Sequence, residues 1–440
     1  MAHVLMLGWE YPPFISGGLG TACEGLSKAL SRLGTQITFV IPKLQGAEEA
    51  GHMNLVDPEQ LMGSVSGTAA AVGAGAEIAG ISTIGLPAFL KPYWGEEEYQ
   101  QAIEQAGLEA ELALGDKFPG VAGLVSSGAG KGGSHYGSSL FEEVARYAAL
   151  VLSSAGTIDF DVIHAHDWMT FPAGVALAQK TGKPLVVHVH SLEYDRSGVN
   201  GGNPTINEFE RLGTSEADSV IAVSHYTKSI IASQHGIDPE KISVSHNGIY
   251  PSEAVEHYQM NKPDNEKWVL FLGRVTFQKG PDYFIEAAAK VIPHVPEAKF
   301  ILAGSGDMLP KLQDRVAELG IEENVVFPGF LRGKAVEEAF LNADLYVMPS
   351  VSEPFGISAL EALNFETPAL ISKQSGVSEV IGHALKFDFW DVDRLADLTI
   401  NALQFGELRE DMLENGKKEL QKLRWDASAE RVQKVYEALV

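Results

Sequence analysis

The chain has 440 residues, of which 45% are hydrophobic and 9% aromatic. This apolar content is enough for the cores of two large domains and excludes a chain that is disordered throughout. The 58 Asp and Glu residues outnumber the 33 Lys and Arg residues, which gives a formal net charge of −25. Nucleic acids and anionic membranes bind positive surfaces, so neither is expected as a partner. The single cysteine, Cys23, cannot form an intrachain disulfide, which is compatible with a reducing compartment.

The N-terminal residues do not indicate a targeting segment. His3–Leu7 is an apolar run of strand length, and no basic region precedes it. The best candidate for a membrane span, residues 68–86, consists mainly of Ala and Gly and contains Glu77, which favours a loop or a packed strand. We therefore expect a cytoplasmic protein without a membrane span.

Short apolar runs alternate with helical patterns along the first half of the chain. A helix is predicted from Ala22 to Leu33, directly after a strand and a glycine-rich turn. The alternation is typical of a parallel sheet with right-handed crossovers. The strands predicted here are His3–Leu7, Gln36–Ile41, Asp161–His164, Pro184–His188, Ser219–Val223 and Ile242–Ser245.

A second unit of the same kind follows a predicted linker at residues 251–266, which contains proline and mixed charges. We predict two doubly wound α/β domains, residues 1–250 and 267–425, and an amphipathic helix from Asp426 to about Leu439. An acidic insertion rich in glycine, about residues 45–135, interrupts the first domain, and no task is assigned to it. The strands predicted in the second domain are Trp268–Leu272, Lys299–Ala303, Asn324–Phe327, Leu345–Met348 and Ala369–Ile371.

A glycine-rich turn, Gly17-Gly18-Leu19-Gly20, follows the first predicted strand. It lies at the carboxyl edge of the sheet, where doubly wound folds bind ligands, and glycine lets backbone amides approach an anion. An ordinary tight turn is an equal alternative.

Two cations follow the first predicted strand of the second domain. Arg274 comes after Gly273, and Lys279 precedes Gly280. An arginine can bind two oxygens at once and a lysine adds a point charge, so the pair suits a diphosphate. The alternative is two solvated surface charges.

Residues 353–361, Glu-Pro-Phe-Gly-Ile-Ser-Ala-Leu-Glu, combine two carboxylates with a predicted helix start near Phe355 or Gly356. The free amides at this start would face the cleft and favour an anion. If the whole segment were helical, Glu353 and Glu361 would be ~12 Å apart along the axis. That spacing suits two polyhydroxylated groups at opposite ends of one ligand, whereas the alternative is a capping and a surface glutamate.

Paired histidines end two neighbouring predicted strands, in the sequences His164-Ala165-His166-Asp167-Trp168 and His188-Val189-His190. Alternate residues of a strand share a face, so either pair could bind a metal ion, as in metal-dependent hydrolases. Simple histidines at strand ends are another alternative. A metal hydrolase would leave the paired glutamates and the Arg274/Lys279 loop unexplained.

Taken together and in this order, the motifs resemble those of retaining GT-B glycosyltransferases, the group that includes glycogen and starch synthases, sucrose-phosphate synthases and mannosyltransferases. Asn247-Gly248 is a further marker. The motifs as a whole resemble glycosyltransferase families four and five. The opening sequence Gly8-Trp9-Glu10-Tyr11-Pro12-Pro13 is similar to glycogen-synthase-like members of family four. The resemblance implies two Rossmann-like domains that face a cleft, an acceptor-side first domain, a second domain that binds the nucleotide sugar, and a C-terminal helix that returns to the first.

The resemblance also implies roles for single residues. Lys279 and Arg274 would hold the donor diphosphate, Glu361 the ribose and Glu353 the transferred hexose, and His166 would face the anomeric carbon. The residues implied as catalytic are His166, Glu353, Arg274 and Lys279. Those implied to bind the donor are Gly18, Arg274, Lys279, Phe355, Gly356, Ile357 and Glu361. Those expected to shape the acceptor site are Tyr194, Asp195 and Arg196.

The activity implied is the transfer of a glucosyl unit, with retention of configuration, from ADP- or UDP-glucose to an α-glucan. No metal or other cofactor is expected, and the partners are a nucleotide-diphosphate sugar and an oligo- or polysaccharide. One alternative is a GT-B transferase of another sugar or acceptor, of mannosyl or sucrose type. The others are a sugar-nucleotide sensor without catalysis and a metal-dependent hydrolase that uses His164, His166, His188 and His190.

Overall fold

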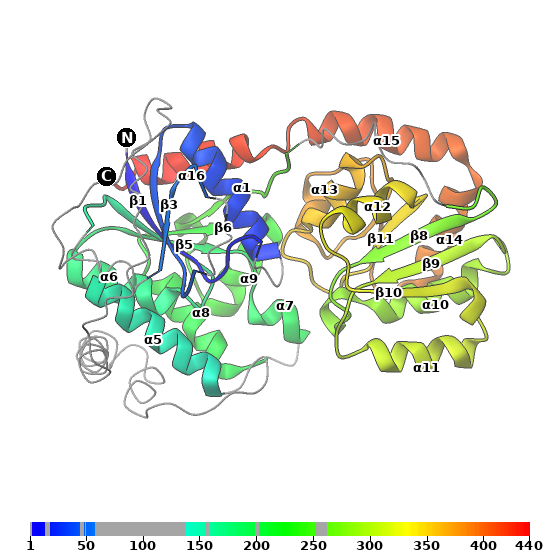
Figure 1. Ribbon diagram of the computed structural model, residues 1–440, viewed down its shortest axis with the longest axis horizontal. Coiled ribbons are helices and arrows are strands. Elements are labelled where there is room, and N and C mark those ends of the chain that lie inside the picture. The colour runs from blue at the N-terminus through cyan, green and yellow to red at the C-terminus, as the bar shows by residue number, and fades with distance from the viewer. Residues whose placement is uncertain are drawn as a thin grey trace, which may run out of the picture.

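The computed structural model describes residues 2–13, 18–44, 48, 50–57, 138–154, 158–198, 202–250 and 262–440. Most of the predicted insertion and most of the predicted linker lie outside these residues. So do Ser16 and Gly17 at the predicted glycine-rich turn. The described chain forms two α/β units that lie side by side (Figure 1).

The first unit is built on a seven-stranded parallel sheet with the order β3-β2-β1-β4-β5-β6-β7. Its strands are β1 His3–Leu7, β2 Gln36–Val40, β3 Asn54–Val56, β4 Val162–His166, β5 Leu185–Val189, β6 Ser219–Ala222 and β7 Ile242–Val244. Its helices are α1 Gly18–Arg32, α5 Ser138–Ser154, α6 Phe171–Thr181, α7 Glu193–Ser197, α8 Pro204–Glu216 and α9 His225–His235. Every residue of β4 and β5 is buried, because helices cover both faces of the sheet.

The second unit is built on a six-stranded parallel sheet with the order β10-β9-β8-β11-β12-β13. Its strands are β8 Lys267–Leu272, β9 Ala298–Ala303, β10 Val325–Gly329, β11 Leu345–Met348, β12 Ala369–Ser372 and β13 Leu385–Phe387. Its helices are α10 Pro281–Val291, α11 Leu309–Leu319, α12 Lys334–Asn342, α13 Ile357–Asn364, α14 Val392–Gln404 and α15 Gly406–Leu420.

The predicted fold class, two doubly wound parallel sheets, is confirmed, and all predicted strands exist. The sequence prediction missed β3 and β13, the outermost strands on one edge of each sheet. Each has three residues, and each includes positions that are not buried, such as Asn54 and Lys386. A strand this short and partly exposed has no apolar run by which it can be recognised.

The last helix, α16 (Trp425–Glu437), packs on the first unit although it follows the second unit in sequence (Figure 1). The Trp425 indole lies against Gly25 of α1, where a Cβ atom would come within 2.2 Å of the ring, so only glycine fits there. At the other end of α16, the Tyr436 hydroxyl lies 2.6 Å from Nδ1 of His164. The chain therefore crosses between the units twice, and the backbone amide of Ile249 donates to the carbonyl of Leu423 where the two crossings meet.

None of the helices in the described ranges is both long enough and apolar enough to cross a membrane.

Candidate active site

The predicted donor cations lie at the carboxyl end of β8, in and beside the 3₁₀ turn Phe277–Lys279. The Lys279 ammonium is 2.5 Å from Oε2 of Glu353, and the same oxygen accepts a hydrogen bond from Ser350 at 3.2 Å. Arg274 donates to the side-chain oxygen of Gln278 at 2.9 Å. The structure thus brings together the Arg274/Lys279 loop and the first glutamate of the 353–361 segment, which the sequence could only place on the same sheet edge.

Glu353 lies in the loop before α13 and not in the helix, so the axial spacing expected for a fully helical segment does not apply. Its backbone amide donates to the carbonyl of Gln374 at 2.9 Å. Gly356 has a φ of +104°, a conformation that favours glycine, and α13 begins at the next residue, Ile357. The prediction placed this start one or two residues too early. The first amides of α13 have no acceptor within the helix, so the N-terminus can bind an anion.

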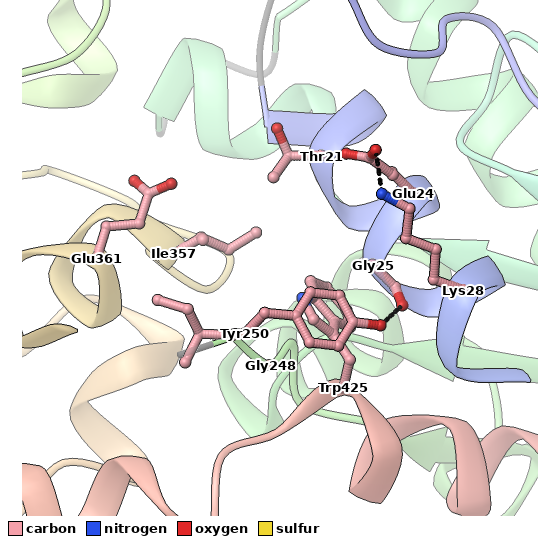
Figure 2. A pocket seen from close by; sticks show the side chains of 10 residues that line it. Thr21, Glu24, Gly25, Lys28, Gly248, Tyr250, Ile357, Glu361 and Trp425 are labelled. Carbon is pink, nitrogen blue, oxygen red and sulfur yellow. Dashed lines mark hydrogen bonds and ion pairs between the residues drawn. The ribbon is translucent and has the colours of Figure 1, made fainter. Parts of the chain in front are cut away.

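Glu361 of α13 lines a pocket between the two units (Figure 2). The Glu361 carboxyl and Ile357 lie on one side of this pocket, and Thr21, Glu24 and Lys28 of α1 lie on the other. Burial raises the pKa of Glu361 from 4.5 to about 7. The residues that line the pocket are Thr21, Glu24, Gly25, Lys28, Gly248, Ile249, Tyr250, Ile357, Glu361 and Trp425.

Gly18 is the first residue of α1 and is exposed. Two residues further along, the amide of Gly20 donates to a carboxylate oxygen of Glu10 at 3.2 Å. A carboxylate of the protein itself therefore occupies one amide at the start of this helix. The role of Gly18 at the donor phosphates stays a prediction.

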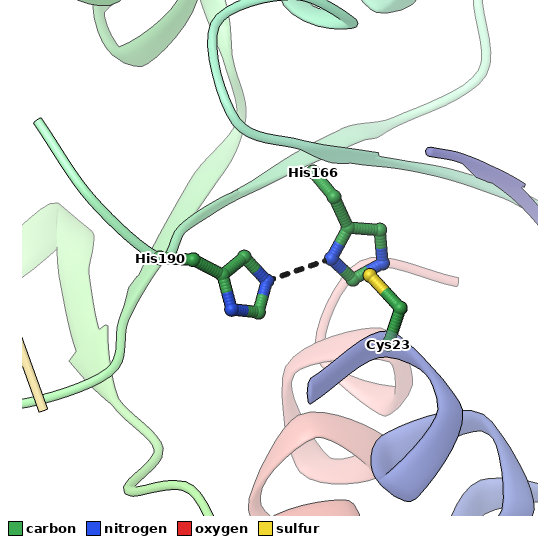
Figure 3. Close-up of side chains that lie close together, drawn as sticks. All are labelled: Cys23, His166 and His190. Carbon is green, nitrogen blue, oxygen red and sulfur yellow. Dashed lines mark hydrogen bonds between the residues drawn. The ribbon is translucent and has the colours of Figure 1, made fainter. Parts of the chain in front are cut away.

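The four histidines of the HxH motifs form one buried stack at the carboxyl edge of the first sheet. The ring centroids of His164 and His166 are 4.3 Å apart, as are those of His188 and His190. Burial lowers the pKa of all four, to about 3 for His164 and His190, so the rings are neutral at pH 7. Nδ1 of His166 is 2.9 Å from Nε2 of His190, and Cys23 of α1 lies beside both rings (Figure 3).

Two overlapping groups of this stack place possible ligand atoms within 4.8 Å of one another: Cys23, His166 and His190, and His164, His166 and His188. The rings of His164 and His188 are nearly parallel, with an interplanar angle of 4° and centroids 5.4 Å apart. The expected absence of a metal ion stays a prediction, and a metal-dependent hydrolase that uses these histidines stays the alternative.

His166 is fully buried in this stack, with 0% of its surface exposed. Its Nε2 atom is buried and has no hydrogen-bond partner among the described residues. The next residue, Asp167, accepts hydrogen bonds from the amides of His190 and Ser191 at 2.7 and 3.3 Å and so ties the end of β4 to the end of β5. The placement of His166 against the anomeric carbon stays a prediction.

The residues expected to shape the acceptor site lie on α7, which follows β5. Asp195 is buried and accepts hydrogen bonds from the amide of Leu192 at 2.8 Å and from the hydroxyl of Ser352, in the second unit, at 2.6 Å. Burial raises the pKa of Asp195 to about 6. Arg196 donates to the hydroxyl of Ser191 at 3.0 Å, and Tyr194 packs against the core of the first unit. Their acceptor role stays a prediction.

Further contacts between the two units surround the 353–361 segment, and no motif in the sequence indicates them. The hydroxyl of Ser224, which caps α9, donates to the carbonyl of Pro354 at 2.6 Å. The Glu379 carboxylate accepts from the amides of His225 and Tyr226 at 2.9 and 2.6 Å, at the positive end of α9. With His225 and His246, Glu379 forms a third group of possible metal ligands, in which Nε2 of His246 lies 3.1 Å from Oε2 of Glu379.

Family models match the chain in three sections. "Glycosyl transferases group 1" matches residues 253–419, "Glycosyltransferase Family 4" matches residues 129–253, and "Starch synthase catalytic domain" matches residues 3–91. The chain is 30% identical to the uncharacterized glycosyltransferase MJ1607 of Methanocaldococcus jannaschii, over 98% of this chain and 97% of the relative. It is a GT-B glycosyltransferase. This glycosyltransferase is also 26% identical to a glycogen synthase of Mycobacterium tuberculosis, over 86% of this chain and 80% of the relative.

Solved structures share the fold of this glycosyltransferase. Sucrose-phosphate synthase from Thermosynechococcus elongatus has a TM-score of 0.70 at 18% identity, with 100% of this chain and 99% of that chain covered. HepE from Anabaena, in a complex with UDP-glucose, has a TM-score of 0.63 at 16% identity, with 100% of both chains covered. At this level of identity the likeness confirms the GT-B architecture that the sequence motifs predicted.

Proposed function

We propose that this GT-B glycosyltransferase moves a glucosyl unit from ADP- or UDP-glucose to an α-glucan and retains the anomeric configuration. The observation that carries this proposal is the 2.5 Å pair of Lys279 and Glu353 beside the N-terminus of α13. It puts a cation and an anion-binding helix end next to a carboxylate that can accept hydrogen bonds from sugar hydroxyls. The matches to a starch synthase domain and to a glycogen synthase support glucose as the sugar and glucan as the acceptor.

On this proposal, the second unit grips the nucleotide diphosphate. Arg274 and Lys279 bind the phosphate oxygens. The amides at Phe355, Gly356 and Ile357 direct the positive ends of their dipoles at the same oxygens. Negative charge grows on the leaving diphosphate while the glycosidic bond breaks, so contacts that tighten then lower the barrier. Each charge-assisted hydrogen bond of this kind is worth about 1.5–3 kcal/mol.

The two glutamates bind the two sugar rings of the donor. Glu361 accepts hydrogen bonds from ribose hydroxyls in the pocket between the units, and Glu353 accepts from the transferred hexose. His166 is neutral, because burial lowers its pKa, so it can stabilise the sugar by a hydrogen bond without repelling positive charge at the anomeric carbon.

The acceptor hydroxyl attacks from the face that the diphosphate leaves, and a phosphate oxygen takes its proton. No side chain is then needed as a general base, and catalysis comes from alignment and electrostatic stabilisation in a closed cleft. Side-chain cations bind the diphosphate in this scheme, so we propose that transfer needs no metal ion.

A donor-by-acceptor screen tests the proposal. Purified protein is incubated with ADP-, UDP- and GDP-linked sugars, with and without glycogen or maltooligosaccharides, in the presence and absence of EDTA, and NMR identifies the anomer of the product. We expect an α-linked glucosyl product from ADP- or UDP-glucose that EDTA does not suppress. A β-linked product, or transfer only from other sugars or to acceptors other than glucans, would contradict it.

A further inference from the structure

A buried hydrogen bond joins α7 of the first unit to the donor side of the second. The Ser352 hydroxyl donates to Asp195 at 2.6 Å, and the exposed fractions of Ser352 and Asp195 are 4% and 1%. A buried carboxylate is costly unless hydrogen bonds satisfy it. Both oxygens of Asp195 have donors, because Leu192 supplies the second one through its amide. Asp195 is therefore hydrogen-bonded at both oxygens, and almost none of its surface is open to a ligand.

The residue that Asp195 holds belongs to the segment that carries the proposed donor-site groups. Ser352 directly precedes Glu353, and its carbonyl accepts from the side chain of Gln278 at 3.2 Å. The amide of Val351 donates back to the carbonyl of Gln278 at 2.9 Å. Gln278 lies next to Lys279 and accepts from Arg274. A shift of Ser352 thus reaches both proposed phosphate ligands and the proposed hexose ligand.

The first unit holds Ser352 at a second point. The Tyr226 hydroxyl of α9 lies 2.9 Å from the Ser352 oxygen. The single hydroxyl hydrogen of Ser352 is directed to Asp195, so Tyr226 must be the donor in this pair. Helix α7 also packs against the 3₁₀ turn Phe277–Lys279. It therefore contacts the turn that carries Lys279 and, through Asp195, the segment that carries Glu353.

We propose that Asp195 is a positioning residue, which through Ser352 couples the acceptor-side helix α7 to Glu353 and Lys279. This inference rests on the proposed function and assigns to Asp195 a role other than contact with the acceptor. The bridge holds Glu353 in place only when α7 and the second unit are apposed, so cleft closure and donor alignment occur together.

Three variants and one double variant test the coupling. Asp195→Asn and Ser352→Ala each remove the charged hydrogen bond. Tyr226→Phe is the matched comparison, because it removes only the weaker, neutral hydrogen bond to Ser352 and leaves the charged one in place. We expect both test variants to lower kcat about tenfold, with glucan and also with water as the recipient of the sugar, and the acceptor KM to stay within about twofold. The double variant, which combines Asp195→Asn with Ser352→Ala, should be no slower than the slower of the two single variants. The turnover of Tyr226→Phe should stay within about twofold of the parent enzyme.

Other results would overturn the proposal. A raised acceptor KM with unchanged donor hydrolysis would place Asp195 in direct contact with the acceptor. Losses that multiply in the double variant, or single variants as fast as the parent enzyme, would show that the bridge does not act on Glu353. Thermal unfolding of each variant separates these outcomes from a failure to fold, and Ser352→Ala, which removes only a hydroxyl, decides the matter if Asp195→Asn is unstable.

A parent enzyme that transfers no sugar would refute the proposed function and leave the coupling open to a binding measurement. Calorimetry with UDP and ADP then compares the same variants. We expect affinities about three- to tenfold weaker in Asp195→Asn and Ser352→Ala and unchanged in Tyr226→Phe, because Gln278 links Ser352 to the proposed phosphate ligands. Equal affinities in all three variants would overturn the coupling.

Discussion

The two sheets have the same parallel architecture but carry different chemistry at their carboxyl edges. The first sheet presents four buried histidines whose pKa values are all lowered by burial, and Cys23 lies beside two of them. The second sheet presents Arg274, the Lys279–Glu353 ion pair and the N-terminus of α13. The histidine rings of the first edge are therefore uncharged at neutral pH, whereas the second edge carries an arginine and an ion pair. The fold alone supplies the location of a site, and the side chains at each edge determine what it can bind.

This difference matches the division within a nucleotide sugar. The diphosphate is anionic and needs cations and amides, whereas the hexose is neutral and needs hydrogen bonds that do not oppose a developing positive charge. If each edge serves one half of the donor, changes at either edge should alter catalysis. The burial of the histidines should in addition make the stability of the protein depend on pH.

The largest effect is expected at the charged edge. Lys279→Ala removes a charge-assisted contact to the diphosphate and leaves the Glu353 carboxylate, which is 7% exposed, without its cation. We expect turnover at saturating donor to fall about ten- to hundredfold. Steady-state kinetics measures this, with Lys290→Ala as the control, because Lys290 pairs with Asp393 at the surface. Unchanged turnover in Lys279→Ala would show that the ion pair of Lys279 and Glu353 does not contribute to catalysis.

A smaller effect is expected from Glu361 as the pH changes. Its pKa is raised to about 7, so at pH 6 about nine-tenths of the carboxyl groups are protonated in the free enzyme. Only the ionised form can accept hydrogen bonds from two ribose hydroxyls through both oxygens. We expect kcat/KM for the donor to fall about tenfold from pH 8 to pH 6, and the fall to be absent in Glu361→Gln. The same acid limb in both proteins would show that another group titrates.

The histidine stack should make the first unit sensitive to acid. The folded pKa values lie below the usual 6.5, so below pH 6.5 the unfolded chain binds more protons and the free energy of unfolding falls as the pH falls. Each such histidine contributes a slope of about 1.4 kcal/mol per pH unit. Both ring nitrogens of His188 lack a hydrogen-bond partner in the described structure, so His188→Phe should keep the ring stack. The substitution should remove the contribution of one histidine to the pH dependence of the free energy of unfolding.

Urea unfolding of the His188→Phe variant and the parent protein between pH 7.5 and 5 measures this difference. An equal pH dependence in the two proteins would mean that His188 titrates normally in the folded state.

The sequence predicted what short-range patterns encode. Apolar runs such as Leu345–Met348 located the strands, and the two-residue period placed His164 and His166 on one face, where the structure stacks them. Contacts between distant segments have no such period. Nothing near Asp195 indicates that its partner is Ser352, 157 residues away, because that contact depends on how the two units meet. For the same reason the ion pair of Lys279 with Glu353 could not be predicted from either motif.

A crystal structure of the protein with UDP or ADP bound tests most directly whether the two unlike edges meet around one donor. We expect the diphosphate to lie between Arg274, Lys279 and the amides of residues 355–357, with the ribose on Glu361 and the terminal phosphate directed toward the histidine edge. A nucleotide bound elsewhere, with Lys279 still paired only to Glu353 and Glu361 in contact only with solvent, would contradict the division of the donor between the two sheets.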